Sequence, residues 1–220
     1  MPWKDGPVNG LRFPDRTVTE LMDRSAPNQT GKALDLGCAV GASSFVLANF
    51  FDRVTGLDFS ESFIEAANEI KRQGFLEYKY LEEGDTFGQG TVRCPEHSDK
   101  VSFIVGDACD LPNEWRGFDL VHAANLICRL PDPHLLFSRL PDLVKVGGQL
   151  LLATPFTWLE EFTPKDKWVG NGNSAQALEE ALSPHFKLEK SVDLPFVIRE
   201  HRRKFQFSVS LGTRWRRVKE

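Results

Sequence analysis

The sequence has few cysteines and no long hydrophobic run. Its four cysteines, Cys38, Cys94, Cys109 and Cys128, are scattered and form no Cys-x-x-Cys pair, which disfavours a disulfide framework and a zinc site. We therefore expect no bound metal and a reducing compartment, the cytoplasm. No stretch is long and apolar enough to cross a membrane, and the N-terminus lacks a signal-peptide pattern, so we expect no membrane partner.

The sequence also lacks an excess of positive charge. The formal net charge is −4 and no run of five like charges occurs, so a general attraction to nucleic acid is missing and we expect no nucleic-acid partner. A basic tract near the C-terminus is interleaved with aromatic residues, which favours a strand with a solvated face over an RNA-binding patch. The tract comprises Arg202, Arg203, Lys204, Phe205, Phe207, Arg214, Trp215, Arg216 and Arg217.

The rest of the chain is organised around the stretch 32–48. An apolar run containing Asp35 leads into two glycines four positions apart, Gly37 and Gly41, and then into a helix-compatible segment. This pattern predicts a buried strand, a tight turn and a helix N-terminus, which is where an α/β sheet holds a nucleotide-like ligand. Small residues at 37, 39 and 41 let the backbone approach such a ligand closely. The alternative is a tight connection with no ligand.

The spacing of this turn separates the possible cofactors. A dinucleotide-binding Gly-x-Gly-x-x-Gly is disfavoured because Ala39 and Ala42 replace its second and third glycines, and no Gly-x-x-x-x-Gly-Lys-Ser/Thr motif is present. The segment Asp35-Leu36-Gly37-Cys38-Ala39-Val40-Gly41 resembles the first motif of class I S-adenosylmethionine-dependent methyltransferases. The resemblance implies S-adenosylmethionine as the cofactor and S-adenosylhomocysteine as its product.

A second predicted strand, 53–58, ends at Asp58 and is followed by Phe59. A carboxylate at such a strand end can accept hydrogen bonds from both hydroxyls of a ribose. The alternative is that Asp58 caps a helix at 61–73, a role that Ser60 could fill equally well. We predict that Asp58 is the ribose ligand.

A third predicted strand, 101–105, runs into Gly106-Asp107-Ala108. This tripeptide resembles the methyltransferase motif in which a carboxylate binds the adenine amino group, which implies that role for Asp107 and a backbone N–H donor at Ala108. The alternative is that Asp107 only terminates the strand. We further predict that the three carboxylates Asp35, Asp58 and Asp107 line one crevice.

A fourth strand and its exit are predicted from Phe118 to Leu130. Ligands of doubly wound sheets lie beyond the carboxyl ends of the central strands, so Asn125, Leu126 and Arg129 should face the transferred methyl group. His122 lies inside the strand, which favours a packed, hydrogen-bonded histidine over a catalytic base.

The predicted fold class is α/β, Rossmann-like, with a seven-stranded, mostly parallel sheet and helices on both faces. Residues 1–30 are interpreted as a lead-in with a cofactor-covering helix near 17–24, and residues 31–220 as one methyltransferase domain. A hairpin or lid is expected as an insertion at 74–100. The remaining predicted elements are a helix from Pro131 to near Lys145, a strand at 149–154, a helix at 170–183, and strands at 186–192 and 204–211, which the methyltransferase resemblance implies are antiparallel.

A narrower resemblance rests on three blocks and on the C-terminal segments 198–206 and 215–217. The blocks are Ala33 to Gly41, Ala124-Asn125-Leu126-Ile127-Cys128-Arg129-Leu130-Pro131-Asp132-Pro133, and Thr154-Pro155-Phe156-Thr157-Trp158-Leu159-Glu160-Glu161-Phe162-Thr163-Pro164. Together they resemble the methyltransferase domain of ovothiol biosynthesis, a mercaptohistidine N-methyltransferase. The resemblance implies methyl transfer to an imidazole nitrogen of 5-thiohistidine, forming ovothiol A. In that family the domain usually follows an iron-dependent sulfoxide synthase domain, which implies such an enzyme as a separate or fused partner.

A thiohistidine acceptor presents an ammonium group, a carboxylate and a ring, and the residues after the fourth and fifth strands match these chemically. We assign Glu160 or Glu161 to a cation or ring N–H, Arg199 or Arg129 to the carboxylate, and Phe156 or Trp158 to the ring face. His201 is either a substrate contact or part of a charge cluster flanking a strand. A protein base is not required if solvent takes the proton.

The candidate residues form three sets. The predicted catalytic set is Asn125, Arg129, Glu160, Glu161 and His201, and the predicted substrate-binding set is Phe156, Trp158 and Arg199. The predicted cofactor-binding set is Asp35, Gly37, Cys38, Ala39, Gly41, Asp58, Phe59, Asp107, Ala108, Asn125 and Leu126. Two alternatives stay open, a methyltransferase of another small molecule and a non-catalytic protein that binds S-adenosylmethionine.

Overall fold

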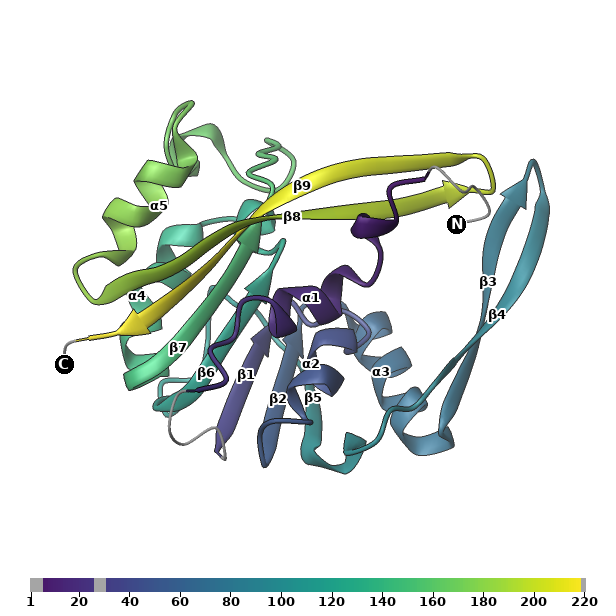
Figure 1. The fold of residues 1–220 in the computed structure, drawn as a ribbon, viewed down its shortest axis with the longest axis horizontal. Helices are drawn as coiled ribbons and strands as arrows, with labels where there is room; N and C mark the ends of the chain where they lie inside the picture. Colours follow the sequence, from purple (N-terminus) through teal and green to yellow (C-terminus); the bar gives the residue numbers. More distant parts are fainter. Residues whose placement is uncertain (1–5, 26–30, 219–220) are drawn as a thin grey trace.

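The computed structural model describes residues 6–25 and 31–218, and a seven-stranded sheet lies at its centre (Figure 1). The strand order is β5-β2-β1-β6-β7-β9-β8. The first five strands of that order are parallel, whereas β9 is antiparallel to both of its neighbours. The predicted fold class is therefore confirmed. The strands of this sheet are β1 (Lys32–Leu36), β2 (Arg53–Asp58), β5 (Val101–Val105), β6 (Phe118–Ala124), β7 (Val144–Thr154), β8 (Phe186–His201) and β9 (Lys204–Arg217).

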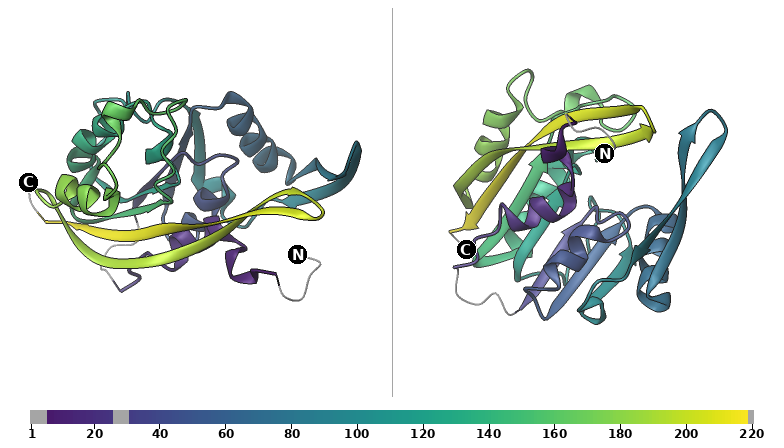
Figure 2. Two further views of the ribbon diagram at one scale, coloured as in Figure 1. Left: turned by 90° about the horizontal axis from the view of Figure 1, so that it is seen from above. Right: turned by 45° about the vertical axis from the view of Figure 1, so that its right-hand side comes forward.

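Helices cover both faces of the sheet (Figures 1 and 2). One face carries α1 (Phe13–Thr19), α2 (Ala42–Leu47) and α3 (Glu61–Gln73), and the other carries α4 (Pro133–Leu143) and α5 (Ser174–Leu182). Short 3-10 turns are η1 (Val8–Gly10), η2 (Ser98–Lys100), η3 (Ile127–Arg129) and η4 (Lys165–Lys167). None of the helices in the described part of the chain is long and apolar enough to cross a membrane.

Three consecutive leucines in β7 show why this segment forms a central strand. Leu150 and Leu152 pack in the cluster that contains α4 and α5, whereas Leu151 packs in the cluster that contains α1, α2 and α3. Successive side chains of a strand point to opposite faces, so a continuous apolar run satisfies a sheet that is covered on both sides. Burial of each leucine contributes about 1.5–3 kcal/mol of transfer free energy.

Several predicted boundaries need correction. The first helix lies at 13–19, earlier than the predicted 17–24, because Pro14 fits the first helical turn, where its missing N–H is not needed. The helix predicted to end near Lys145 ends at Leu143, and the next strand begins at Val144 rather than 149, passing through Gly147 at a φ of +79°. Within the predicted lead-in, residues 1–5 and 26–30 lie outside the described residues.

The C-terminal half also departs from the predicted boundaries. The helix predicted at 170–183 begins only at Ser174, because Gly170 and Gly172 have positive φ angles of 74° and 83° that no helix accommodates. The last two strands are longer than the predicted 186–192 and 204–211. β8 continues through Pro195 because β8 is an edge strand, where a missing N–H costs no ladder hydrogen bond on its open side.

Two antiparallel arms extend beyond the sheet (Figures 1 and 2). The insertion at 74–100 forms a separate hairpin of β3 (Phe75–Glu83) and β4 (Thr86–Arg93). The tips of the β8–β9 pair and of this hairpin meet where the Arg202 amide donates to the Glu82 carbonyl oxygen at 3.0 Å. The contact joins two segments that are far apart in the sequence.

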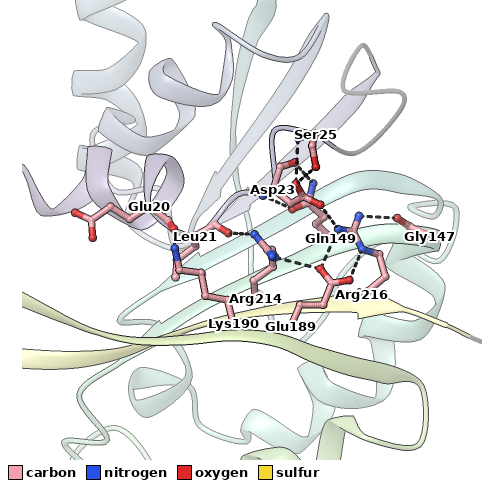
Figure 3. Close-up of polar contacts among 10 residues, drawn as sticks. All are labelled: Glu20, Leu21, Asp23, Ser25, Gly147, Gln149, Glu189, Lys190, Arg214 and Arg216. Atoms are coloured by element: carbon pink, nitrogen blue, oxygen red, sulfur yellow. Dashed lines mark hydrogen bonds and ion pairs between the residues drawn. The ribbon is translucent and has the colours of Figure 1, made fainter.

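The segment after α1 is fixed to the sheet by a polar cluster (Figure 3). The Asp23 amide donates to Gln149 Oε1 at 2.8 Å, and Arg216 Nη2 lies 2.8 Å from Asp23 Oδ2. Arg216 also donates to Glu189, which lowers the pKa of that carboxyl group. Arg214 Nη1 donates to the Leu21 carbonyl oxygen at 3.1 Å. These contacts hold α1 against the face of the sheet.

Candidate active site

A crevice of about 720 Å³ opens where β1, β2, β5 and β6 end. Its volume lies within the usual range for small-molecule sites, roughly 300–1,000 Å³. Parallel strands place their carboxyl ends at one edge, so residues predicted from four separate motifs meet here. The predicted residues that line the crevice are Gly37, Asp58, Phe59, Asp107, Ala108, Asn125, Leu126, Arg129 and Glu161.

The turn after β1 depends on its small residues. Gly37 has a φ of +68°, and a Cβ there would lie 3.0 Å from Leu126 Cδ1. Gly41 has a φ of +89°, and its Cβ would lie 2.4 Å from the Phe103 ring. Ala39 also has a positive φ, of 48°. The backbone therefore curls tightly after β1, and a larger side chain would displace Leu126 of the crevice wall at Gly37 and the Phe103 ring of β5 at Gly41.

Asp58 is held rigidly at the end of β2. Its Oδ2 accepts a hydrogen bond from the Ala39 amide at 2.8 Å, and its Oδ1 accepts one from the Ser60 amide at 2.9 Å. Ser60 caps α3 by accepting from the Phe63 amide at 3.3 Å. The capping role is thus filled by Ser60, which leaves the remaining lone pairs of the Asp58 carboxylate free for ligand hydroxyls.

Asp107 takes a similar position after β5. Its Oδ1 accepts from the Cys109 amide at 2.8 Å, an arrangement that fixes the carboxylate at the crevice wall. Asp58 and Asp107 therefore supply two oriented carboxylates to one cavity with apolar neighbours such as Phe59 and Leu126. These two carboxylates can accept hydrogen bonds from the polar edge and the sugar of a nucleoside. Their negative charge also complements a positively charged sulfonium.

Asp35 does not line the crevice, which corrects the prediction that all three carboxylates do. Its side chain is fully buried, with Oδ2 accepting from Ser43 Oγ at 2.7 Å and Ser44 Oγ at 2.6 Å. His122 Nδ1 lies 2.7 Å from Asp35 Oδ1, and His122 Nε2 lies 2.9 Å from Thr17 Oγ1. The prediction that His122 is packed and hydrogen-bonded is confirmed.

Three predicted residues of the turn lie beneath the cavity rather than in its wall. Cys38 is buried, and this burial raises the pKa of its thiol, so it is not a thiolate at neutral pH. Cys38, Ala39 and Gly41 are not among the lining residues. Their backbone shapes the turn, and Ala39 contributes through its bond to Asp58.

The wall formed by β6 and its exit carries Asn125 and Arg129. Asn125 adopts a φ of +54°. Its backbone amide donates to the Ala153 carbonyl oxygen at 2.7 Å, and its side-chain Oδ1 accepts from Ser210 Oγ at 2.7 Å. Arg129 Nη1 donates to the Thr157 carbonyl oxygen at 2.8 Å, and its guanidinium lies 4.8 Å from the centroid of the Phe162 ring. Arg129 thereby holds the segment after β7 over the mouth.

Glu161 lines the mouth of the crevice, but its neighbour Glu160 does not. Glu160 is exposed and forms an ion pair with Lys165 at 3.0 Å.

Trp158 Nε1 donates to Ser174 Oγ at 3.0 Å, and its ring stacks on Trp168. Phe156 packs against the core with a φ of +50° and is likewise absent from the lining.

Arg199 and His201 lie away from the crevice, which corrects their predicted place in the site. Arg199 Nη2 bonds Glu82 Oε1 at 2.8 Å, and its guanidinium lies 4.5 Å from the centroid of the Tyr80 ring. His201 Nδ1 accepts from the Arg203 amide at 3.2 Å in the same arm. The reason is the length of β8, which extends into an arm and carries both residues beyond the sheet.

Some lining residues were not predicted. Sequence proximity could have indicated Ser60 and Phe63 beside Asp58, and Phe162 beside Glu161, whereas Leu130 and Pro131 have no individual signal. The full set of additional lining residues is Leu57, Ser60, Phe63, Gly106, Ala124, Leu130, Pro131 and Phe162.

Within residues 6–25 and 31–218 no group of three or more His, Cys, Asp or Glu side chains could hold a metal ion.

The sequence is similar to known methyltransferases. A profile described as "Methyltransferase domain" matches residues 34–152, more than half of the chain. The ubiquinone biosynthesis O-methyltransferase of Coxiella burnetii is 29% identical over 121 residues, covering 55% of this chain and 42% of that protein. O-methyltransferase cnsE of Penicillium expansum is 26% identical over 140 residues, covering 63% and 43%. The chain thus spans less than half the length of these curated relatives.

A solved structure supports the same fold. The N-methyltransferase NodS of Bradyrhizobium japonicum, in complex with S-adenosylhomocysteine, superposes with a TM-score of 0.60 at 15% identity. The superposition covers 99% of this chain and 92% of that one. Together with the profile match and the crevice at the sheet edge, this places the chain in the methyltransferase domain family, whose members use S-adenosylmethionine.

Proposed function

We propose that the protein transfers a methyl group from S-adenosylmethionine to an imidazole nitrogen of 5-thiohistidine, forming ovothiol A. The observation that carries the donor half of this proposal is the pair of fixed carboxylates, Asp58 and Asp107, in one crevice. The acceptor half rests on the sequence blocks at 124–133 and 154–164, which resemble the ovothiol methyltransferase domain and which meet at the mouth of that crevice through Arg129 and Glu161.

The residues of the crevice fit the donor. Asp58 would accept hydrogen bonds from the ribose hydroxyls, and Asp107 and the Ala108 amide would bind the adenine edge. When bound, S-adenosylmethionine supplies a methyl group on a sulfonium sulfur. Asn125 and Leu126, which follow β6, would border the reacting end, and Phe162 would help to exclude water.

The mouth of the crevice offers one group of each charge to the acceptor. Arg129 has further guanidinium N–H groups besides the one bonded to Thr157, and a free N–H can bind the acceptor carboxylate. Glu161 makes no hydrogen bond or ion pair with any described residue, so it can bind the acceptor ammonium group or a ring N–H. Fixing the acceptor nitrogen in line with the methyl group is the main catalytic task, and orientation alone can supply as much as about 7–11 kcal/mol.

The ring proton released on transfer needs an acceptor. Glu161 is positioned at the mouth to take it, and solvent is the alternative because the crevice is open there. Loss of turnover in Glu161→Gln with unchanged affinity for S-adenosylhomocysteine would assign Glu161 to the acceptor. Unchanged turnover would leave the proton to solvent and remove Glu161 from the proposal.

The setting of the reaction is also part of the proposal. An iron-dependent sulfoxide synthase, separate or fused, would supply a sulfoxide precursor, from which cleavage of one C–S bond and reduction by a cellular thiol would release the thiohistidine. A reducing cytoplasm suits the four cysteines, which are all free thiols in the structure. Incubation of the two enzymes with their substrates, a C–S lyase and a thiol reductant, followed by mass spectrometry, should show the methylated thiol only when both enzymes are present.

Acceptor identity is tested by a mass-spectrometric screen with S-adenosylmethionine as donor. We expect methylated product from 5-thiohistidine and much less from histidine, which lacks the sulfur. Equal methylation of both, or of neither, would contradict the thiohistidine assignment. Because the two curated relatives described above are named O-methyltransferases, hydroxy compounds belong in the same screen as a second acceptor class.

A further inference from the structure

The β3–β4 hairpin has an aromatic face that the proposed function does not use. Tyr78 and Tyr80 are the only tyrosines in the sequence, and their ring centroids lie 6.0 Å apart on one face of β3. They pair in register with Gly90 and Gly88 of β4. A Cβ at either glycine would lie 2.6 Å from the facing ring, so the rings lie flat against bare backbone. The glycines thus make room for the rings at a cost in strand propensity.

Tyr78 faces a second pocket of about 670 Å³ between the hairpin and the outer side of α2. Its walls are mainly apolar and include Val46 of α2, Ile70 of α3, and Leu76 and Val92 of the hairpin. Among the described residues, no lining residue is shared with the donor crevice. The pocket is therefore a separate site with a volume suited to a small molecule.

The charged groups of this pocket are not balanced. Arg12 forms an ion pair with Asp15 at 2.5 Å, and both line the pocket. Arg93 also lines it, and its guanidinium makes no hydrogen bond or ion pair with any described residue. One guanidinium is therefore available beside an apolar wall and an exposed tyrosine ring, which is the combination that binds an anionic group attached to a hydrophobic body.

We propose that this pocket binds a small amphipathic carboxylate. The carboxylate pairs with Arg93, and the apolar body lies between the Tyr78 ring and Val46. The pocket also reaches Val40, which lies between Ala39 and Gly41 in the turn that forms the floor of the donor crevice. A molecule that fills the pocket thus contacts Val40 on the outer side of this turn and leaves the donor crevice open.

The test uses 4-phenylbutyrate in titration calorimetry, with S-adenosylhomocysteine present at saturation so that the donor crevice is filled. We expect saturable binding of one molecule, and weaker binding of the uncharged 4-phenylbutanol. Arg93→Gln should weaken the acid roughly two- to fivefold, as expected for a solvent-exposed ion pair. Tyr78→Ala should weaken it about tenfold through loss of ring contact, whereas Tyr78→Phe should retain it.

Two controls and a second pocket variant keep this test decisive. Phe87→Ala removes an exposed aromatic ring from the opposite face of the hairpin, and Arg72→Gln removes an exposed guanidinium outside the pocket, so both should bind as wild type. Val46→Glu places a like charge on α2 inside the pocket and should abolish binding without altering the hairpin.

Two results would overturn the proposal. They are no saturable binding in the presence of S-adenosylhomocysteine, and equal binding of the acid and the alcohol. The experiment measures no methyl transfer, so its failure would leave the proposed function untouched.

Discussion

Asp35 and His122 lie opposite each other on the parallel strands β1 and β6, with 2.7 Å between Asp35 Oδ1 and His122 Nδ1. Ser43 and Ser44 of α2 donate hydrogen bonds to Asp35 Oδ2. Thr17 Oγ1 of α1 contacts His122 Nε2 on the other side of the ring. Both members of the pair are buried. The pair therefore joins two strands and two helices beneath the cofactor turn and fixes the position of that turn.

Replacing this histidine should destabilise the protein and loosen the turn. His122→Phe keeps an aromatic ring of similar size. It removes the contact of the ring with Asp35 Oδ1 and the contact of the ring with Thr17 Oγ1. We expect a loss of about 2–4 kcal/mol in the free energy of unfolding, measured in urea, and weaker binding of S-adenosylhomocysteine. The exposed His134→Ala serves as control and should change neither. If His122→Phe lost turnover with full stability and donor affinity, His122 would belong to the chemistry instead.

The polar cluster of Figure 3 predicts acid sensitivity. Hydrogen bonding to Arg216 lowers the pKa of Glu189 below its ordinary value, so the folded state favours the ionised carboxylate. A lowered folded-state pKa contributes stability at neutral pH that is lost as pH falls through the ordinary and then the lowered value. Glu189→Gln should therefore lower the free energy of unfolding by about 0.5–1.5 kcal/mol at neutral pH, and the difference from wild type should shrink in acid.

Thermal melts of both proteins from neutral to acid pH check this prediction. A loss of about 1 kcal/mol corresponds to roughly 2–4 °C in a chain of this size. Glu65→Gln, an exposed residue without an ion pair among the described residues, should follow the wild-type curve at every pH. A gap between Glu189→Gln and wild type that stays constant into strong acid would contradict the assignment.

Arg129 should affect the acceptor more than the donor. Arg129→Gln removes the guanidinium that contacts the Phe162 ring and the Thr157 carbonyl oxygen, and with it the positive charge at the mouth. We expect KM for thiohistidine to rise about tenfold, which corresponds to about 1.4 kcal/mol, with a smaller change in affinity for S-adenosylhomocysteine.

Arg129→Lys separates charge from shape. Lysine keeps the charge but has neither the planar fork nor the stacking surface, so a partial rescue of KM would indicate a carboxylate contact. A donor affinity that falls as far as the acceptor KM rises would show that Arg129 shapes the whole crevice instead.

Local sequence signals predicted residues that meet at one crevice. Gly37 and Gly41 occupy backbone conformations with positive φ. Asp58 ends β2 and Asp107 follows β5, and the carboxyl ends of parallel strands meet at one edge of the sheet. Turn geometry within a few residues favours glycine at 37 and 41, and the strand pattern alone places residues 58 and 107 at strand ends. A single sequence is enough to read such requirements.

The errors came from features that depend on tertiary structure. Asp35 was expected in the crevice, but strand alternation points it to the α1–α2 face, where Ser43 and Ser44 bind it. Arg199 and His201 were expected near the acceptor, but the continuation of β8 into an arm takes them away. Neither the face of a buried polar residue nor the length of an edge strand follows from local pattern.

The central claim, that Asp58 and Asp107 bind one ligand, is directly measurable. Titration calorimetry with S-adenosylhomocysteine should show single-site binding to the wild type. Asp58→Asn and Asp107→Asn should each weaken it about tenfold or more, because each loses a charge-assisted hydrogen bond of about 1.5–3 kcal/mol. The exposed Asp52→Asn should bind as wild type. No binding to the wild type, or equal affinity in all four proteins, would contradict the account.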